Sequence, residues 1–168
     1  MYIDIDVNKT VRKLENFWNH IHFHPTDAIE DYWGKAILDQ VAQDGAAKYV
    51  RIYSMFEDIV SRKENGELEY DFTLNDSRID YMIEKGFKLL ICCNFMPRAI
   101  ARDPNLMSKA KRYKGKKLYF SEPANYKDWQ EVLYNYVKHL VDRYGIEEVS
   151  SWYFHCWNEP DHSYWLND

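Results

Sequence analysis

The amino-acid sequence predicts an α/β fold in which helices alternate with strands and the strands form a parallel sheet. Two observations support this class. Three segments with a helical pattern of apolar residues each end at a glycine, namely Gly45, Gly86 and Gly145. A short run rich in β-branched and aromatic residues follows each of these glycines. Such alternation requires crossover connections, which place the strands parallel in one sheet.

The clearest helix is predicted over residues 129–144. Its apolar residues recur three or four positions apart over about four turns, so they share one face of the helix. Arg143 lies in the last turn, where positive charge interacts favourably with the helix dipole, and Gly145 is suited to end the helix. The predicted apolar face consists of Trp129, Val132, Leu133, Tyr136, Val137, Leu140, Val141 and Tyr144.

Two earlier helices are predicted from shorter patterns. The first begins near Asp27, with Glu30 three residues later as a capping-box pair, and ends at Gly45. The second begins around Asp76 and ends at Gly86. The apolar faces are Ile29, Trp33, Ala36, Ile37 and Val41 in the first helix, and Ile79, Met82 and Ile83 in the second.

The segments that follow the strands are longer than those that follow the helices. Residues 54–74 and 96–124 each follow a predicted strand. This asymmetry is typical of a TIM-type (β/α) barrel, where the loops after the strands build the active site. The sequence therefore predicts parallel β/α units of such a barrel. The predicted strands are residues 17–23, 48–53, 87–93 and 149–157.

The length of 168 residues limits how much of a barrel the chain can form. A complete eight-stranded barrel needs roughly 250 residues. We therefore expect only about four strands, as a half barrel. An open half barrel exposes two sheet edges and an apolar inner face. We expect a second copy of the chain, as a homo-oligomer, or a separate C-terminal half to cover them.

Composition excludes several classes of partner. The net charge of −5 gives no broad basic surface for nucleic acid or an anionic membrane. The longest apolar run, Leu89 to Cys93, is far short of the ~20 residues that span a bilayer. The first residues are acidic and contain no apolar run, so we expect no signal peptide in this segment. Three cysteines argue against a disulfide framework, and buried free thiols predict a cytoplasmic location.

The segment 152–161 contains the candidate catalytic group. A strand rich in aromatic residues ends there in Asn158-Glu159, and Pro160 prevents its continuation. Barrel enzymes carry their catalytic groups at the carboxyl ends of strands. Aromatic neighbours such as Trp157 desolvate a carboxyl, which favours a general acid, and Asn158 is placed to hydrogen-bond a sugar hydroxyl.

These residues and three other motifs resemble glycoside hydrolase family 39, whose members include β-xylosidases and α-L-iduronidases with a (β/α)8 fold. The Asn158-Glu159 pair resembles the acid/base signature at the end of the family's fourth strand. The resemblance spans about residues 17–165 and implies that residues 1–168 are a single N-terminal half, about the first four strands, of the family's catalytic (β/α)8 domain. The other motifs are Tyr49-Val50-Arg51 in the second strand, Asn94-Phe95-Met96-Pro97 with Ala101 after the third, and Trp129, His139-Leu140 and Arg143-Tyr144-Gly145 in the following helix.

The resemblance implies a retaining glycoside hydrolase that cleaves β-xylosides or related glycosides and needs no cofactor. It implies that Glu159 is the general acid/base. It also implies a carbohydrate-binding set made of Asn158, Trp157, Tyr53, Arg51, Asn94 and His24.

The sequence departs from the family pattern in three places. The family's nucleophile is a glutamate on the seventh strand, and no Asp or Glu here matches it, although retention requires two carboxyl groups about 5–5.5 Å apart. We therefore expect the isolated chain to be inactive. Tyr53 stands where the family often has His, and His155-Cys156 stands where it has a Glu before Val-Trp-Asn-Glu-Pro.

Two alternative functions remain open from the sequence. The first is a non-catalytic carbohydrate-binding or assembly module that uses Trp152, Trp157 and Tyr53 to stack on sugars. The second is a metal-dependent hydrolase. His20, His22 and His24 alternate and share one face of a strand, so that His22 and His24 would hold zinc.

Overall fold

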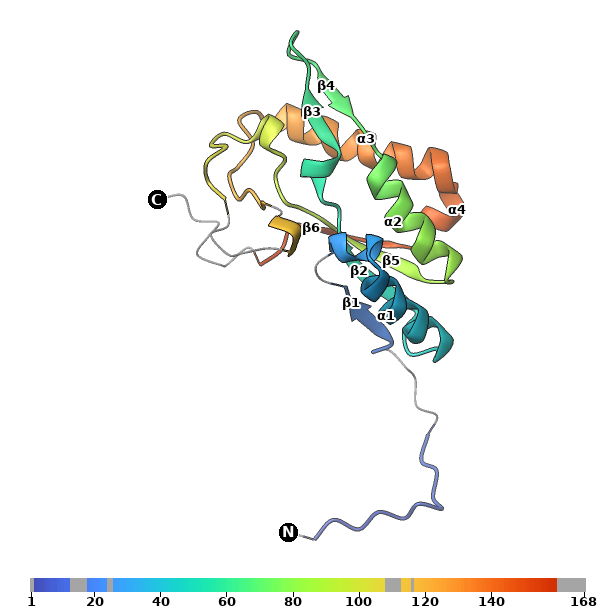
Figure 1. Ribbon diagram of the computed structural model, residues 1–168. Helices are drawn as coiled ribbons and strands as arrows, with labels where there is room; N and C mark the ends of the chain where they lie inside the picture. The colour runs from blue at the N-terminus through green and yellow to red at the C-terminus, as the bar shows by residue number, and fades with distance from the viewer. Residues whose placement is uncertain (1, 13–17, 24–25, 108–112, 116, 160–168) are drawn as a thin grey trace.

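A computed structural model describes residues 2–12, 18–23, 26–107, 113–115 and 117–159 (Figure 1). Four parallel strands form one sheet in the order β1-β2-β5-β6, which confirms the predicted α/β class. Helices alternate with these strands along the chain. The strands are β1 (His20–His22), β2 (Tyr49–Tyr53), β5 (Lys88–Cys93) and β6 (Tyr153–Cys156).

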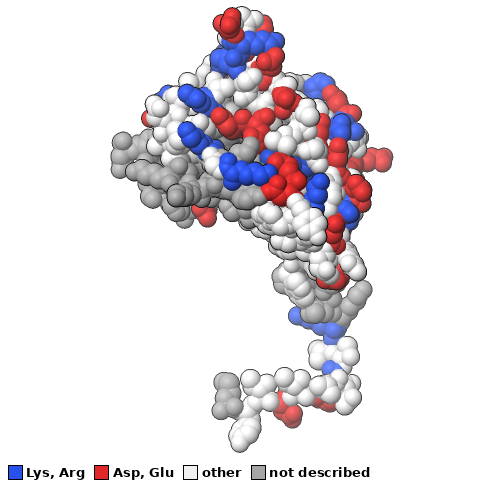
Figure 2. Space-filling view, in the orientation of Figure 1, with Lys and Arg blue, Asp and Glu red and all other residues white. Residues whose placement is uncertain are grey.

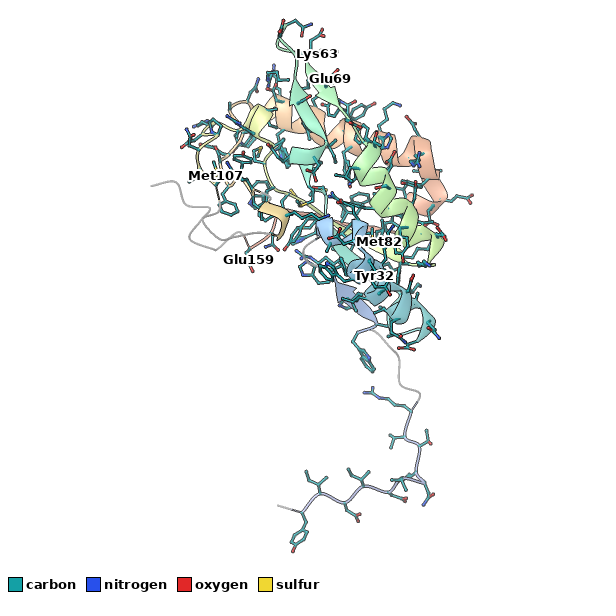
Figure 3. The ribbon with its side chains drawn as sticks, viewed as in Figure 1. Tyr32, Lys63, Glu69, Met82, Met107 and Glu159 are labelled. Carbon is teal, nitrogen blue, oxygen red and sulfur yellow. The ribbon has the colours of Figure 1, made fainter. Side chains whose placement is uncertain are left out.

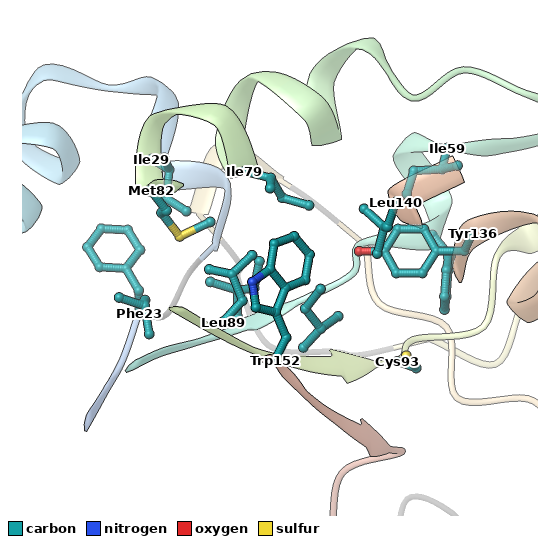
Figure 4. Close-up of a cluster of buried hydrophobic side chains, with 14 of the residues drawn as sticks. Phe23, Ile29, Ile59, Ile79, Met82, Leu89, Cys93, Tyr136, Leu140 and Trp152 are labelled. Carbon is teal, nitrogen blue, oxygen red and sulfur yellow. The ribbon is translucent and has the colours of Figure 1, made fainter. Parts of the chain in front are cut away.

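Three long helices pack against one face of the sheet. They are α1 (Tyr32–Gln43), α2 (Thr73–Glu84) and α3 (Tyr126–Tyr144). Val50 and Leu89 are register partners on the helix-facing side, and both are fully buried. Helix side chains such as Met82 and Leu140 pack with strand residues in one core (Figure 4).

Short segments complete the described part of the chain. Four 3₁₀ turns are η1 (Thr26–Glu30), η2 (Phe56–Asp58), η3 (Arg98–Ile100) and η4 (Tyr113–Gly115). A fourth α-helix, α4 (Ile146–Val149), lies between α3 and β6. Within the described ranges, no helix combines the length and the apolarity needed to cross a membrane.

The helix predicted over residues 129–144 is confirmed in α3. Asn125 accepts a hydrogen bond from the backbone of Lys127 at 2.9 Å and caps the helix, which begins at Tyr126, three residues before the predicted start. Val132, Tyr136 and Leu140 are buried on the predicted face. Gly145 ends the helix with φ of 83°, a conformation that residues with side chains rarely adopt.

The prediction for the first helix was wrong in its start and in part of its face, although Ile29 is buried and Val41 packs against the core as predicted. The chain first forms the 3₁₀ turn η1, and the helix α1 begins after its N-cap residue Asp31. Ile29 is therefore not on the same helix as the residues that follow. This break changes which residues face the core. Trp33 and Ile37 are largely exposed, and α1 buries Gly34 and Leu38 instead.

Gly34 is required where η1 and α1 meet. A Cβ atom at this position would lie 1.9 Å from the carbonyl oxygen of Ala28 and 3.2 Å from the ring of Phe23. Because neither a backbone carbonyl nor a buried ring yields that much space, only glycine permits this packing.

The second helix begins earlier than predicted. It starts at Thr73, whose backbone N–H donates to the Asp71 carboxylate at 2.9 Å. Ile79 and Met82 are buried as predicted. The predicted start at Asp76 was therefore one turn late, because Asp71 provides the N-terminal hydrogen bond.

The segment predicted as a loop over residues 54–74 contains an antiparallel hairpin. Its strands are β3 (Val60–Arg62) and β4 (Leu68–Tyr70), and it projects away from the sheet (Figure 1). The turn includes Asn65-Gly66, and Lys63 donates its backbone N–H to Glu67 at 2.9 Å. Asn-Gly between short β-rich runs is the sequence signal for a hairpin.

The last strand is shorter than the predicted range 149–157. Val149 ends α4, and β6 covers only Tyr153–Cys156. Residues 145–149 therefore extend the helical region beyond Gly145 before the chain enters the sheet.

The cysteines differ in their surroundings. Cys92 and Cys93 are both buried and face opposite sides of β5, as strand alternation predicts. Cys156 is exposed in the described structure, so the expectation that all three thiols are buried was wrong.

Candidate functional site

Glu159 follows the carboxyl end of β6. Its side chain is exposed and lies well separated from the β3–β4 hairpin, on which Lys63 and Glu69 are labelled (Figure 3). Trp157 and Glu159 adopt φ angles of 69° and 47°. Such left-handed conformations are uncommon for residues with side chains and recur at functional sites. The sharp change of direction places the carboxyl at the end of the sheet.

Arg51 on β2 connects to the residue just before Glu159. Its Nη2 atom donates a hydrogen bond to Oδ1 of Asn158 at 2.7 Å. A guanidinium-to-oxygen bond of this length is charge-assisted and stronger than a bond between neutral groups. It fixes the orientation of the Asn158 amide and directs its Nδ2 donors away from Arg51.

The guanidinium of Arg51 is itself held by neighbouring strands. Its Nη1 atom lies 3.1 Å from Nε2 of His22 on β1, and Nη2 lies 3.4 Å from the sulfur of Cys92 on β5. The guanidinium carbon also lies 5.1 Å from the centre of the Tyr53 ring, within the range of a cation–π interaction.

Tyr53 lies among aromatic side chains rather than at the surface. The structure buries its side chain, and its ring centre lies 5.5 Å from that of Phe95 and 5.3 Å from that of His22. A second hydrophobic cluster surrounds it, on the face of the sheet opposite the main core. This cluster consists of Tyr53, Met55, Cys92, Phe95, Leu118 and Phe120.

Trp157 is half-buried and packs edge-to-face on Trp129 at the start of α3, with ring centres 5.9 Å apart. The aromatic contact connects the segment after β6 to α3, and it turns the Trp157 ring toward the main core. A role of Trp157 in carbohydrate binding stays a prediction.

Trp152 does not lie beside Trp157 and Tyr53. It is buried in the main core, and its indole N–H donates to Glu148 at 2.8 Å. The hypothesis that Trp152 stacks on a sugar in a binding module was therefore wrong, because its ring faces the core and α4.

Of the two remaining predicted contacts, the structure describes Asn94 and does not describe His24. Asn94 is fully buried, and its carbonyl oxygen accepts a hydrogen bond from the Ser54 hydroxyl at 2.9 Å. Its role in sugar binding stays a prediction that burial does not favour. His24 lies outside the described residues.

Sequence reasoning gave no functional role to Cys92 or His155. Nδ1 of His155 lies 3.3 Å from the sulfur of Cys92, and the two residues are register partners on β6 and β5. Side chains alternate between the two faces along each strand. Counting from Arg51 across the paired strands would therefore have placed Cys92 and His155 on the same face as Arg51. Burial raises the pKa of the Cys92 thiol to about 11, although the Arg51 guanidinium acts in the opposite direction.

The described residues do not support the metal-dependent hydrolase. No three His, Cys, Asp or Glu side chains within the described ranges are grouped so that they would hold a metal ion. His22 instead contacts the Arg51 guanidinium, a cation that would repel a metal ion at this place.

Charged side chains show no single-sign patch on the face displayed in Figure 2. Lys and Arg are interspersed with Asp and Glu over this face.

Comparison with known proteins gives consistent matches. The sequence is 32% identical over 166 residues to a beta-xylosidase of Caldicellulosiruptor saccharolyticus, which covers 96% of this chain and 33% of that protein. It is 27% identical to the alpha-L-iduronidase of Mus musculus, over 95% of this chain and 24% of that protein. The chain thus spans about a third or less of the length of these relatives.

Solved structures give the same result. A monomeric beta-xylosidase from Caulobacter crescentus CB15 superposes with a TM-score of 0.72 at 27% identity, covering 88% of this chain and 28% of that one. The model of the family described as glycosyl hydrolases family 39 matches residues 1–168. Because this family model covers the whole of residues 1–168 and a beta-xylosidase is 32% identical over 96% of the chain, this chain is a member of glycosyl hydrolases family 39.

Proposed function

We propose that Glu159 is the general acid/base of a retaining glycoside hydrolase. The Glu159 carboxyl would protonate the glycosidic oxygen as the leaving group departs, and its carboxylate would then deprotonate the incoming water. The observation that carries this proposal is the 2.7 Å hydrogen bond from Arg51 to Asn158. This hydrogen bond orients Asn158, the residue beside Glu159, from strand β2.

The proposed substrates are β-xylosides or related glycosides. Two relatives at 32% and 30% identity are beta-xylosidases, from Caldicellulosiruptor saccharolyticus and Geobacillus stearothermophilus. Asn158 provides a hydrogen-bonding amide next to Glu159, which suits a sugar hydroxyl. The Trp157 ring packs on Trp129 at the start of α3, and its exposed part is the aromatic surface that we propose for contact with a sugar ring.

We further propose that residues 1–168 lack the nucleophile and are inactive alone. The described sheet is open, with β1 and β6 at its edges, and Tyr153 and Phe154 on β6 are 59% and 40% exposed. These exposed aromatic side chains favour a covering element. A second copy or another polypeptide segment would cover them, and the latter would add the second carboxyl.

External azide provides a direct test of the acid role. Azide attacks C1 of an aryl β-xyloside as the C1–O bond breaks, and Glu159 donates its proton to the leaving oxygen. We expect the purified chain to release the phenol only when azide is present, with xylosyl azide as the second product. With a poorly activated phenol as leaving group, Glu159→Gln lowers this rate by about 10²- to 10⁴-fold.

Glu147→Gln is the matched control, because Glu147 is exposed on α4, remote from the end of β6. Equal rates for the wild type and Glu159→Gln would reject the acid role. Binding of xylobiose without azide-dependent product would favour the alternative, a carbohydrate-binding module.

A further inference from the structure

Cys92 on β5 and its hydrogen-bond partner Arg51 on β2 together link all four strands of the sheet. Cys92 is fully buried near the end of β5, and its sulfur accepts a hydrogen bond from Arg51 on β2 at 3.4 Å. Nδ1 of His155 on β6 lies 3.3 Å from the same sulfur. Arg51 in turn contacts His22 on β1. The thiol therefore connects Arg51 directly to the last strand.

The thiol also contacts the backbone that leads to Glu159. The sulfur of Cys92 donates to the carbonyl oxygen of Trp157 at 3.6 Å. This carbonyl belongs to the peptide unit before Asn158, whose side chain is bound by Arg51. The Trp157 carbonyl is thus bound from β5, and the Asn158 side chain is bound from β2.

The segment needs such contacts because of its backbone conformation. Trp157 and Glu159 have φ angles of 69° and 47°, which side-chain-bearing residues adopt rarely unless surrounding interactions stabilise them. The described contacts that do so are the Arg51 bond, the Cys92 bond and the packing of Trp157 on Trp129.

The protonation state of Cys92 suits a hydrogen-bond donor. Burial raises the pKa of its thiol to about 11, so the proton stays on the sulfur at neutral pH. A protonated thiol is a weak nucleophile, whereas it donates one hydrogen bond and accepts others.

We propose that Cys92 is a positioning residue that fixes the conformation of residues 157–159 and thereby the direction of the Glu159 carboxyl. The consequence for reaction rate rests on the proposed glycosidase function, whereas the effect on conformation does not. His155 takes part in the same contact, at the position where the sequence departs from the family pattern.

The variants Cys92→Ala and Cys92→Ser test this proposal, with Cys93→Ala as the matched control. Cys93 is the next residue on β5 and is also buried, but it faces the main core on the other side of the sheet. Loss of either thiol removes a buried sulfur atom from the same strand. Only loss of the Cys92 thiol removes the contacts with Arg51 and the Trp157 carbonyl.

The first measurement is a ¹⁵N NMR spectrum of the intact chain. We expect Cys92→Ala to shift the backbone amide signals of residues 157–159 and the side-chain amide of Asn158. Cys92→Ser, which keeps a donor with a shorter reach, restores part of the shift, and Cys93→Ala leaves these signals in place. Unchanged signals in Cys92→Ala, or equal shifts in Cys93→Ala, would overturn the proposal.

The second measurement is the azide-dependent rate with an aryl β-xyloside. A misplacement of about 1 Å costs on the order of 100-fold in rate, so we expect a 10- to 100-fold loss of kcat in Cys92→Ala with little change in KM. Partial recovery in Cys92→Ser supports positioning. A wild-type chain that forms no product contradicts the proposed function, and the NMR comparison still decides the role of Cys92.

Discussion

The guanidinium of Arg51 and the amide of Asn158 lie 2.7 Å apart although 107 residues separate them in the sequence. The contact joins the middle of β2 to the end of β6, with β5 lying between these two strands in the sheet. Parallel strands place their carboxyl ends at one edge, so residues distant in sequence meet there. The order of the strands in the sheet therefore brings the residues of the candidate site together.

The Arg51–Asn158 contact predicts measurable coupling in a double-mutant cycle. Arg51→Met and Asn158→Ala should show a coupling free energy of about 0.5–3 kcal/mol, because each variant removes the same charge-assisted bond. Urea denaturation of the two single variants and the double variant gives this value.

Asn135→Ala combined with Arg51→Met is the control pair. Asn135 is on α3 and hydrogen-bonds Tyr70, on the helix side of the sheet. Its effect should add to that of Arg51→Met within about 0.5 kcal/mol. Additivity for the Arg51–Asn158 pair would show that the hydrogen bond does not stabilise the site.

A buried ion-pair network around Arg78 gives a second prediction. Arg78 on α2 is 1% exposed and pairs with Glu30 at 2.5 Å and Asp58 at 3.1 Å. Arg78→Ala removes the buried cation that Glu30 and Asp58 share and leaves Glu30 with its longer contact to Lys114 at 3.5 Å. We expect this to cost about 3–5 kcal/mol of unfolding free energy. Chemical denaturation measures the loss.

Arg62→Ala is the control for this prediction. Arg62 pairs with Asp128 at 2.6 Å, but its side chain is 37% exposed, so the loss should stay near 0–1 kcal/mol. Similar losses in both variants would mean that burial of Arg78 adds nothing to the strength of its network.

The pH dependence of stability should reveal the ion pair of Glu148. A hydrogen bond from Lys88 at 2.5 Å holds the pKa of the Glu148 carboxyl below its ordinary value of 4.5. A carboxyl with a lowered pKa in the folded state contributes stability above pH 4.5, and this contribution disappears as pH falls through the folded-state pKa.

Glu148→Gln should therefore lower the unfolding free energy by up to about 1 kcal/mol at pH 7, and the difference from the wild type should shrink below pH 4.5. Thermal unfolding at a series of pH values measures this effect. Glu147→Gln on the same helix is the control. A difference that stays constant between pH 7 and pH 3 would contradict the assigned ion pair.

Local sequence patterns correctly predicted the helices and helix ends that depend on residues close together in the sequence. The face of α3 follows from apolar spacing alone, and Gly145 ends that helix because its φ is positive. The start of α1 could not be predicted from apolar spacing. Its register depends on the packing of Ala28 in η1 against Gly34, a contact that spacing within one helix does not reveal.

The sequence by itself determined the parallel α/β class, the family, and the place of Asn158 and Glu159 after a strand, because these depend on local periodicity and short motifs. Only the tertiary structure decided that Arg51 contacts Asn158, that Cys92 joins Arg51 to His155, and that Asn94 and Trp152 are buried. Those relationships depend on strand order and register across 40 to 110 residues of chain. Spacing along a single element carries no information about them.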